Sequence, residues 1–269
     1  MKKALHRTYI ALILGILYIP ILTLIFFSFN AANSTAVFEG FSLYWYGELF
    51  SSPDTFIALS NTLILAVSAA TLSTVIGTAA CEGIYRMRRM SAQLLKSVTN
   101  IPMMNPDIVT GMSMMLFFVA LVGILQLDYE SFGFVAMLIA HTTFCLPYVI
   151  LSVLPRREEL GKTYTEAAMD LGCTPLQSFF KVELPNLLPG ILSGFMMAFT
   201  LSLDDFVISY FVGSSSFQTL PLLIYSMTKK KVKPDMYALS TLIIVAVFLM
   251  LIISNVRSGK KLRREGGKP

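Results

Sequence analysis

Stretches of about 20 mostly apolar residues recur along this chain, and a helix of that length is what crosses the hydrocarbon core of a bilayer. Six such stretches lie near residues 8–29, 61–85, 98–125, 132–154, 187–212 and 237–256. Of the 269 residues, 55% are hydrophobic and only 14% are charged, whereas a soluble domain carries roughly 25% charged residues. A water-soluble globule and a disordered chain are therefore excluded. We expect an all-α integral membrane protein with six transmembrane helices.

The first apolar stretch follows the basic sequence MKKALHR, which is also how a secretory signal peptide begins. The stretch is longer than the roughly 7–15 residues of a signal-peptide core. Residues 31–36 (AANSTA) resemble a cleavage site only weakly. We therefore interpret the segment as an uncleaved first span.

The basic residues predict the orientation of the spans, because cytoplasmic loops are enriched in Lys and Arg. Seventeen of the 21 fall at the N-terminus, in the second-to-third and fourth-to-fifth loops, and at the C-terminus: Lys2, Lys3, Arg7, Arg86, Arg88, Arg89, Lys96, Arg156, Arg157, Lys162, Lys181, Arg257, Lys260, Lys261, Arg263, Arg264 and Lys268. This predicts that both termini are cytoplasmic. Four lysines disagree, since they fall in the fifth-to-sixth loop: Lys229, Lys230, Lys231 and Lys233. The net charge of +5 therefore concerns topology and membrane lipid rather than nucleic acid.

The loop between Arg156 and Pro185 is too long and too rich in helix-forming residues to be a simple connector. Residues 158–171 predict one helix, with capping chemistry at Thr163 and Thr165, and Gly172 predicts its end. Thr174-Pro175 predicts a second helix with an apolar face formed by Leu176, Phe179, Phe180 and Leu184. From physics alone, an amphipathic connector lying on the lipid headgroups and a docking element for a soluble partner are both open.

One pattern in this loop separates the two alternatives. Glu166-Ala167-Ala168, three residues, Gly172, nine residues and then Val182-Glu183-Leu184-Pro185 resembles the EAA motif of bacterial ABC importer permeases, with Val182 in place of isoleucine. The resemblance implies a type I ABC permease fold. It also implies that Glu166, Ala167, Ala168, Gly172, Leu184 and Pro185 belong to a coupling helix that docks on a separate ATPase subunit.

Further segments are similar to the spermidine/putrescine permeases of that family: SLYWY at 42–46, NPDIVTG at 105–111, HTTFCLP at 141–147 and FTLSLDDF at 199–206. The resemblance implies a second homologous permease subunit, two ATP-binding subunits, an extracytoplasmic binding protein and the bacterial inner membrane. We divide the chain into a first helix with its outer loop (1–56), a permease domain (57–256, coupling loop 156–186) and a basic tail (257–269).

Carboxylates inside the predicted spans need an explanation, because an ionised one costs roughly 2.5–3.5 kcal/mol at the bilayer centre. Asp107 falls about nine residues into the third stretch, and Asp204 and Asp205 are adjacent in the fifth, where a continuous helix would point them about 100° apart. They can attract a cationic cargo such as a polyamine, as the resemblance also implies. Alternatively, each caps a broken or kinked helix.

Trp45 lies between Tyr44 and Tyr46 in the first outer loop. It can contact a cation or the protein that delivers it, or it can be an interfacial anchor. We expect Glu82 to pair with Arg86 one turn later. His141 is expected to be a hydrogen-bonded packing residue, with no Asp or second His near it in the sequence. Cys81, Cys145 and Cys173 are expected to be small apolar fillers.

No phosphate-binding loop or hydrolase motif occurs in the sequence, so we expect no catalytic residues, metal or cofactor in this chain. The leading hypothesis is the polyamine permease subunit of an ATP-driven importer. The alternatives are an ABC permease for ferric ion or another small solute, a proton-coupled carrier that uses Asp107 and His141, and a membrane enzyme that uses Asp204 and Asp205. The lack of an inverted repeat disfavours the carrier.

Overall fold

The computed structural model describes residues 2–32, 37–126, 129–161, 163–214, 216–229, 236–242, 244, 245 and 248. The chain forms two compact units, one of Met1–Phe56 with Ile224–Pro269 and one of Ile57–Leu223. Within the described ranges, all regular structure is helical apart from one β-bridge between Asn30 and Phe41. The prediction of an all-α chain is confirmed for these residues.

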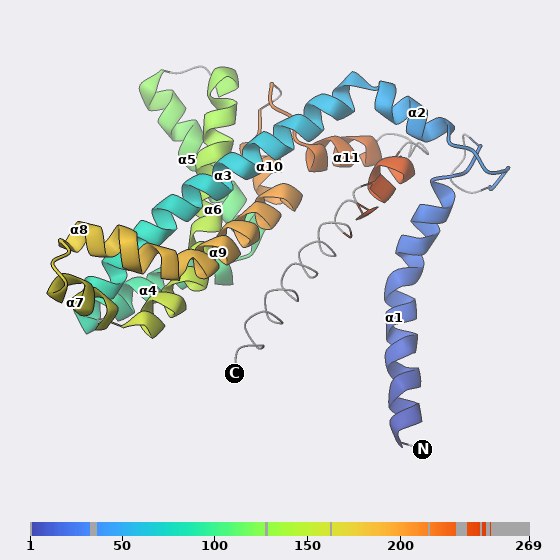
Figure 1. Cartoon of the computed structure of the whole chain (residues 1–269). Helices are drawn as coiled ribbons and strands as arrows, with labels where there is room; N and C mark the ends of the chain where they lie inside the picture. The colour runs from blue at the N-terminus through green and yellow to red at the C-terminus, as the bar shows by residue number, and fades with distance from the viewer. Residues whose placement is uncertain are drawn as a thin grey trace. The chain divides into compact units, whose positions relative to one another are not determined.

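The helices follow one another along the chain in the order coloured in Figure 1. Their bounds are α1 Lys2–Phe27, α2 Tyr44–Ser51, α3 Pro53–Arg86, α4 Arg89–Met104, α5 Asp107–Leu125, α6 Tyr129–Leu160, α7 Thr163–Asp170, α8 Pro175–Ser178, the π-helical turn η1 Phe179–Glu183, α9 Leu184–Asp204, α10 Val207–Val212 and α11 Leu220–Lys229. Residues 236–242 are also helical.

Four helical segments among the described residues are long and apolar enough to cross a membrane: Pro53–Arg86, Asp107–Leu125, Phe132–Leu160 and Pro175–Asp204. Leu12–Phe27 is a shorter apolar stretch within α1. Most of the sixth predicted span, 237–256, lies outside the described residues. Four spans are therefore established by length and composition.

The third predicted span is wrong in its first part, because residues 98–125 do not form one helix. Helix α4 ends at Met104 and α5 begins at Asp107. Asn105 precedes Pro106, and the proline ring disfavours helical backbone at the residue before it. Asn105 accordingly has an extended ψ of 142°. Asp107 thus lies in the first turn of α5 rather than nine residues into a span.

The fifth predicted span is also divided. Helix α9 continues directly from α8 and η1, ends at Asp204, and is followed by an extended Asp205 with ψ 124° and by the short helix α10. The expected 100° separation of Asp204 and Asp205 therefore does not hold, since it assumed a continuous helix.

The loop helix predicted for residues 158–171 is wrong at its start. Helix α6 extends to Leu160, the chain turns at Gly161, and only Thr163–Asp170 form α7. Gly161 has φ +62° and Gly172 has φ +88°. Both values lie in the left-handed region that glycine adopts without a Cβ clash. The predicted stop at Gly172 agrees with the end of α7.

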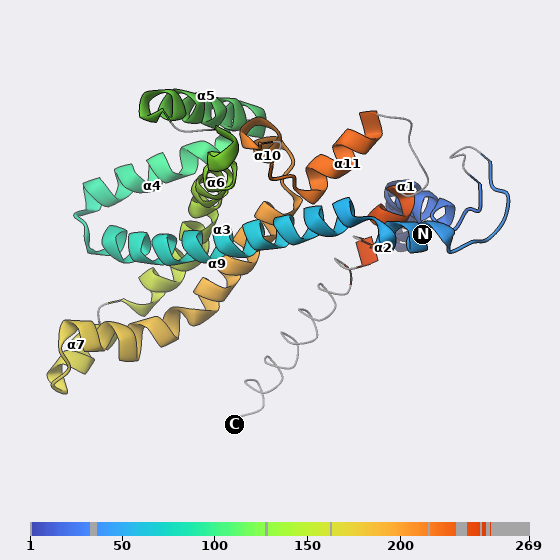
Figure 2. The same ribbon diagram turned by 90° about the horizontal axis from the view of Figure 1, so that it is seen from above.

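Close packing of α9 on α6 forms the centre of the Ile57–Leu223 unit. Small residues recur every four positions on the buried face of α9: Gly190, Gly194, Ala198 and Ser202. A Cβ on Gly194 would lie 3.3 Å from the Cα of Val149, and one on Gly190 would lie 3.1 Å from the Ser152 carbonyl oxygen. The small side chains therefore let the two backbones approach, as in other membrane helix pairs. Figure 2 shows α7 at one end of α9 and α10 at the other.

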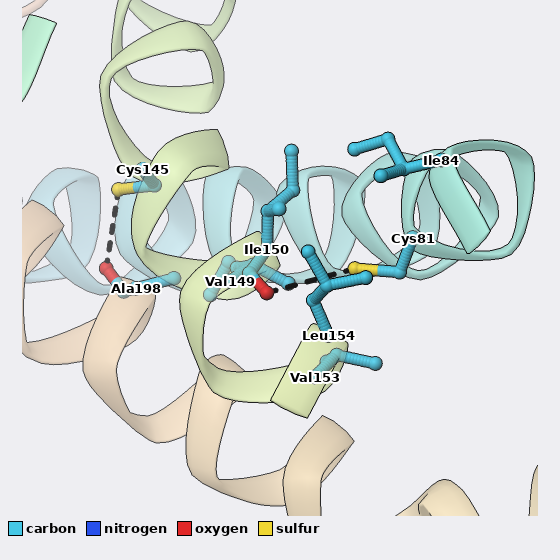
Figure 3. Packing of buried hydrophobic residues seen from close by; sticks show 9 residues of the cluster. Cys81, Ile84, Cys145, Val149, Ile150, Val153, Leu154 and Ala198 are labelled. Atoms are coloured by element: carbon cyan, nitrogen blue, oxygen red, sulfur yellow. Dashed lines mark hydrogen bonds between the residues drawn. The ribbon is translucent and has the colours of Figure 1, made fainter. Parts of the chain in front are cut away.

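Two buried apolar clusters flank this contact. The first is drawn in Figure 3 and joins α3, α6 and α9 through Ala70, Cys81, Ile84, Cys145, Val149, Ile150, Val153, Leu154 and Ala198. The Cys81 thiol lies 3.6 Å from the Ile150 carbonyl oxygen, and the Cys145 thiol lies 3.4 Å from that of Ala198. Both act as small buried fillers, as predicted, whereas Cys173 is half-buried. The second cluster includes Leu65, Phe118, Met137 and Ile208.

Candidate functional site

A buried polar group occupies the break between α9 and α10, and we call it the helix-break cluster: His141, Ser202, Asp205 and Ser209. The carboxylate of Asp205 accepts hydrogen bonds from the backbone N–H of Ile208 at 3.2 Å and of Ser209 at 2.9 Å. The Ser209 hydroxyl also donates to it at 3.1 Å. Asp205 therefore caps α10, which supports the capping alternative for this residue.

His141 of α6 completes the helix-break cluster. Its side chain is fully buried, with Nδ1 2.7 Å from the Ser202 hydroxyl and Nε2 3.1 Å from the Ser209 hydroxyl. Nε2 is also 3.5 Å from Oδ2 of Asp205. The prediction of a hydrogen-bonded packing residue is confirmed. No Asp lies near His141 in the sequence, but the fold brings Asp205 to it across 64 positions.

Asp204 and Asp205 differ in their surroundings although they are adjacent. Asp204 is the last residue of α9 and is exposed, whereas the Asp205 side chain is only 7% exposed. Asp107 is exposed at the start of α5, and no side-chain cap is formed there. One turn further on, Gly111 of α5 packs against the Phe211 ring of α10. The two exposed carboxylates, Asp107 and Asp204, therefore lie where apolar helices are interrupted.

Trp45 lies within the other unit, in the first turn of α2. Its indole N–H donates to the Asn30 carbonyl oxygen at 2.9 Å, and the residue is 7% exposed. The neighbouring Tyr46 hydroxyl lies 2.7 Å from that of Ser28, and Tyr44 is exposed. Trp45 thus secures α2 to the chain that follows α1. Its predicted contact with cargo stays a prediction.

The residues that resemble the EAA motif lie on α7 and at the start of α9. Glu166 and Ala167 are exposed, Ala168 is buried, and Gly172 makes the turn after the helix. Leu184 and Pro185 open α9, with Leu184 half-buried and Pro185 exposed. Exposed apolar side chains surround the turn from α7 to α8: Tyr164, Met169, Leu171, Leu176 and Phe180.

The second loop helix begins at Pro175 as predicted. Thr174 is its N-cap, and Thr174 and Gln177 form a reciprocal capping box, with bonds of 3.3 and 3.1 Å. Helix α8 is only four residues long, because a π-helical turn carries the chain from Phe179 to Glu183 into α9. The apolar face predicted for this segment is therefore shared between α8, η1 and α9.

The sequence analysis missed an ion cluster that reaches α7 through Thr165, and we call it the arginine cluster: Glu82, Arg157, Glu183 and Thr165. Arg157 of α6 is 2% exposed, and its Nε donates to Oε2 of Glu82 at 2.6 Å. Its Nη2 lies 3.1 Å from Oε2 of Glu183, which is also 2% exposed. The predicted Glu82–Arg86 pair is confirmed at 2.5 Å, but Arg86 is the more exposed partner. The sequence signal for this cluster is Glu183, a charged residue between the apolar Val182 and Leu184 of the segment that resembles the EAA motif.

The four lysines that opposed the predicted orientation are only partly described. Lys229 ends α11, and its ammonium lies 4.7 Å from the centre of the Tyr225 ring. Lys230, Lys231 and Lys233 lie outside the described residues, as does the basic tail from residue 257. The four lysines therefore still disagree with the orientation predicted from the other basic residues.

Apolar helices of membrane-spanning length, interrupted at acidic residues and joined by a compact helical loop, indicate an integral membrane protein. The family described as "Binding-protein-dependent transport system inner membrane component" matches residues 73–261. The chain belongs to this family.

Two curated relatives are similar over nearly the whole chain. The putrescine transport system permease protein PotI of Escherichia coli is 39% identical over 248 residues, which cover 91% of this chain and 88% of the relative. The spermidine/putrescine transport system permease protein PotC of Haemophilus influenzae is 37% identical over 256 residues, which cover 95% and 97%. These homologues are transport permeases rather than enzymes.

The fold is similar to a solved structure of a bacterial ABC transporter involved in the import of the acidic polysaccharide alginate. The TM-score is 0.76 at 13% sequence identity, and the match covers 96% of this chain and 94% of the other. A structure of a bacterial alginate ABC transporter with an alginate-bound periplasmic protein gives a TM-score of 0.73, also at 13% identity. At this identity the likeness concerns the fold alone.

Proposed function

We propose that this chain is a permease subunit of an ATP-driven ABC importer that moves polyamines, spermidine or putrescine, across the bacterial inner membrane. The observation that carries the proposal is the identity of 37–39% over more than nine tenths of the chain to permeases named for putrescine and spermidine. The chemistry of the two exposed carboxylates agrees with a cationic cargo.

Asp204 and Asp107 are the residues best suited to meet that cargo. Each is exposed at the end of an apolar helix, where a carboxylate is costly unless it faces water or a cation. A polyamine ammonium group can donate charge-assisted hydrogen bonds to such a carboxylate. The cation would replace part of the solvent that each carboxylate loses in the membrane.

Asp205 and Trp45 take supporting roles in this proposal. The Asp205 carboxylate already accepts three hydrogen bonds that hold the start of α10, so its main effect on cargo is to fix the direction of Asp204. The buried indole of Trp45 would act by holding α2 so that Tyr44 is presented outside.

Helix α7, with Glu166 to Gly172, is the proposed coupling helix that docks on an ATPase subunit. The supporting observations are that Glu166 and Ala167 of α7 are exposed, and that the turn after α7 carries the exposed apolar side chains of Leu171 and Leu176. The complete assembly would contain a second homologous permease, two ATP-binding subunits and an extracytoplasmic binding protein. The chain would cross the membrane six times, with both termini in the cytoplasm, a permease domain at 57–256 and a lipid-facing basic tail at 257–269.

The test is uptake of radiolabelled putrescine and spermidine by cells that carry the complete importer as their sole polyamine system. We expect Asp204→Asn to reduce uptake by at least roughly tenfold, since the charge-assisted bond is lost. Asp54→Asn is the matched control, because Asp54 is an exposed aspartate at the start of α3. ATP-dependent uptake of ferric ion or another solute, with no polyamine uptake, would show that the cargo assignment is wrong.

A further inference from the structure

The arginine cluster joins helices that are far apart in the sequence. Arg157 lies near the end of α6, Glu82 lies near the end of α3, and Glu183 ends the π-helical turn that leads into α9. Besides the two carboxylates, Arg157 donates from Nη1 to the Gly161 carbonyl oxygen at 3.1 Å. Its guanidinium also lies over the Tyr85 ring, 3.8 Å from the ring centre. The guanidinium is thus in contact with α3 through Glu82 and Tyr85, with the turn after α6 through Gly161, and with η1 through Glu183.

The cluster continues into α7 through one hydroxyl group. The Thr165 hydroxyl donates to Oε1 of Glu183 at 2.6 Å. The other oxygen of Glu183 faces Arg157, so the carboxylate bridges α7 and α6. A continuous path of side chains therefore runs from α7 through Thr165, Glu183 and Arg157 to Glu82 of α3.

The backbone alone would hold α7 less firmly than the backbone together with the Thr165–Glu183 hydrogen bond. Gly161 precedes the helix and Gly172 follows it, both with positive φ, and glycine is the residue with the greatest conformational freedom. Apolar packing of α7 within the loop includes the buried Ala168. The Thr165–Glu183 bond is the polar contact that connects α7 to the buried charges of the helical bundle.

Buried charges are retained only where each has a partner, since an unpaired one is strongly unfavourable. Arg157 and Glu183 are both almost completely buried, and Glu82 is shared between Arg157 and the exposed Arg86. The cluster can therefore not separate at low cost. It is suited to moving as one body when α7 moves.

We propose that Glu183 and Arg157 are positioning residues that transmit displacement of α7 to α3 and α6, with Thr165 as the attachment point on α7. This inference rests on the proposed function, in which α7 docks on an ATPase subunit. The arginine cluster connects α7 rigidly to the ends of α3 and α6, so that ATP-driven movement of α7 reaches these two helices.

The test measures polyamine uptake per ATP hydrolysed by the complete importer in proteoliposomes. Thr165→Val keeps the shape of the side chain and removes only its bond to Glu183. We expect it to lower the ratio roughly fivefold or more, the scale of an ordinary coupling free energy. Thr165→Ser should restore the ratio, because the hydroxyl is retained. Thr163→Val is the matched control on the same helix, since Thr163 is exposed.

The outcomes separate this inference from the proposed function. If the wild-type complex takes up no polyamine, or does so without ATP, both are wrong. If the wild type is coupled and Thr165→Val keeps its ratio, or Thr165→Ser loses as much as Thr165→Val, only the inference is wrong. If Thr165→Val releases the ATPase subunits while the two permeases still co-purify, the result supports attachment of α7 through Thr165.

Discussion

The helix-break cluster and the arginine cluster are both buried and polar, but they differ in the groups with which their side chains pair. The helix-break cluster pairs with backbone groups, since Asp205 accepts from the N–H groups of the first turn of α10. The arginine cluster also pairs with one backbone carbonyl, that of Gly161 after α6, but it mainly joins charged side chains from α3, α6 and η1. In a membrane, an interrupted helix must satisfy its own backbone locally. Arg157 does more than this, because it also pairs with charged side chains of α3 and η1, as the proposed transmission from α7 requires.

The two clusters are connected through the same pair of helices. His141 and Arg157 are both on α6, about 24 Å apart at 1.5 Å per residue. Helix α9 runs between them, with Glu183 just before its start and Ser202 near its end. Packing of α9 on α6 therefore sets the geometry of both clusters at once.

Removal of the arginine should have the largest effect on stability. Arg157→Met leaves Glu82 and Glu183 without their shared partner, and an uncompensated buried charge costs about 3–5 kcal/mol. We expect a marked fall in the melting temperature of the purified complex. Adding Glu183→Gln to Arg157→Met should recover part of the loss. A melting temperature equal to the wild type would show that the cluster is solvated.

Loss of the carboxylate at the helix break should be the next largest effect. Asp205→Ala leaves the amides of Ile208 and Ser209 without their acceptor, at a cost of about 2 kcal/mol. Asp204→Asn should leave the melting temperature unchanged while lowering uptake. Thermal unfolding and uptake measured on the same preparations check both. Equal stability loss for the two aspartates would remove the distinction between a capping and a cargo-facing residue.

The α6–α9 contact can be loosened without altering a charge. Gly194→Val places a side chain 3.3 Å from the Val149 backbone and should cost about 1.5 kcal/mol through overpacking. Uptake should fall with stability because both clusters shift together. Gly123→Val is the control, since a Cβ there meets nothing within 4 Å. An unaffected Gly194→Val protein would mean that the two helices can separate freely.

The smallest effect is expected for a surface ion pair beside the arginine cluster. Arg156 and Glu159 are 2.9 Å apart, with side chains 50% and 67% exposed. Glu159→Gln should change stability by less than about 0.5 kcal/mol, because water screens such a pair. The melting temperature of the Glu159→Gln protein is the reference against which the loss in Arg157→Met is measured. A loss comparable with that of Arg157→Met would mean that burial does not distinguish the two arginines.

Local sequence patterns predicted the parts of the fold that depend on nearest neighbours. The spans follow from runs of apolar residues, and the turn at Gly172 and the start of the second loop helix at Pro175 follow from single residue types. Pro106 also indicates the break between α4 and α5, inside the stretch 98–125 that is predicted as one span. The break at Asp205 is predicted only as an alternative, because no proline or glycine lies beside it in the sequence.

Hydrophobicity and motif spacing are local properties, so the sequence alone predicts a helical membrane protein with acidic residues at Asp107, Asp204 and Asp205, and a loop that resembles the EAA motif of permeases. That Asp205 caps α10 beside His141 while Asp204 stays exposed depends instead on how the helices pack. Only the tertiary structure pairs Arg157 with Glu82, 75 positions away, and with Glu183. The physical reason is that a buried charge requires a partner, and helix packing determines which distant side chain can provide it.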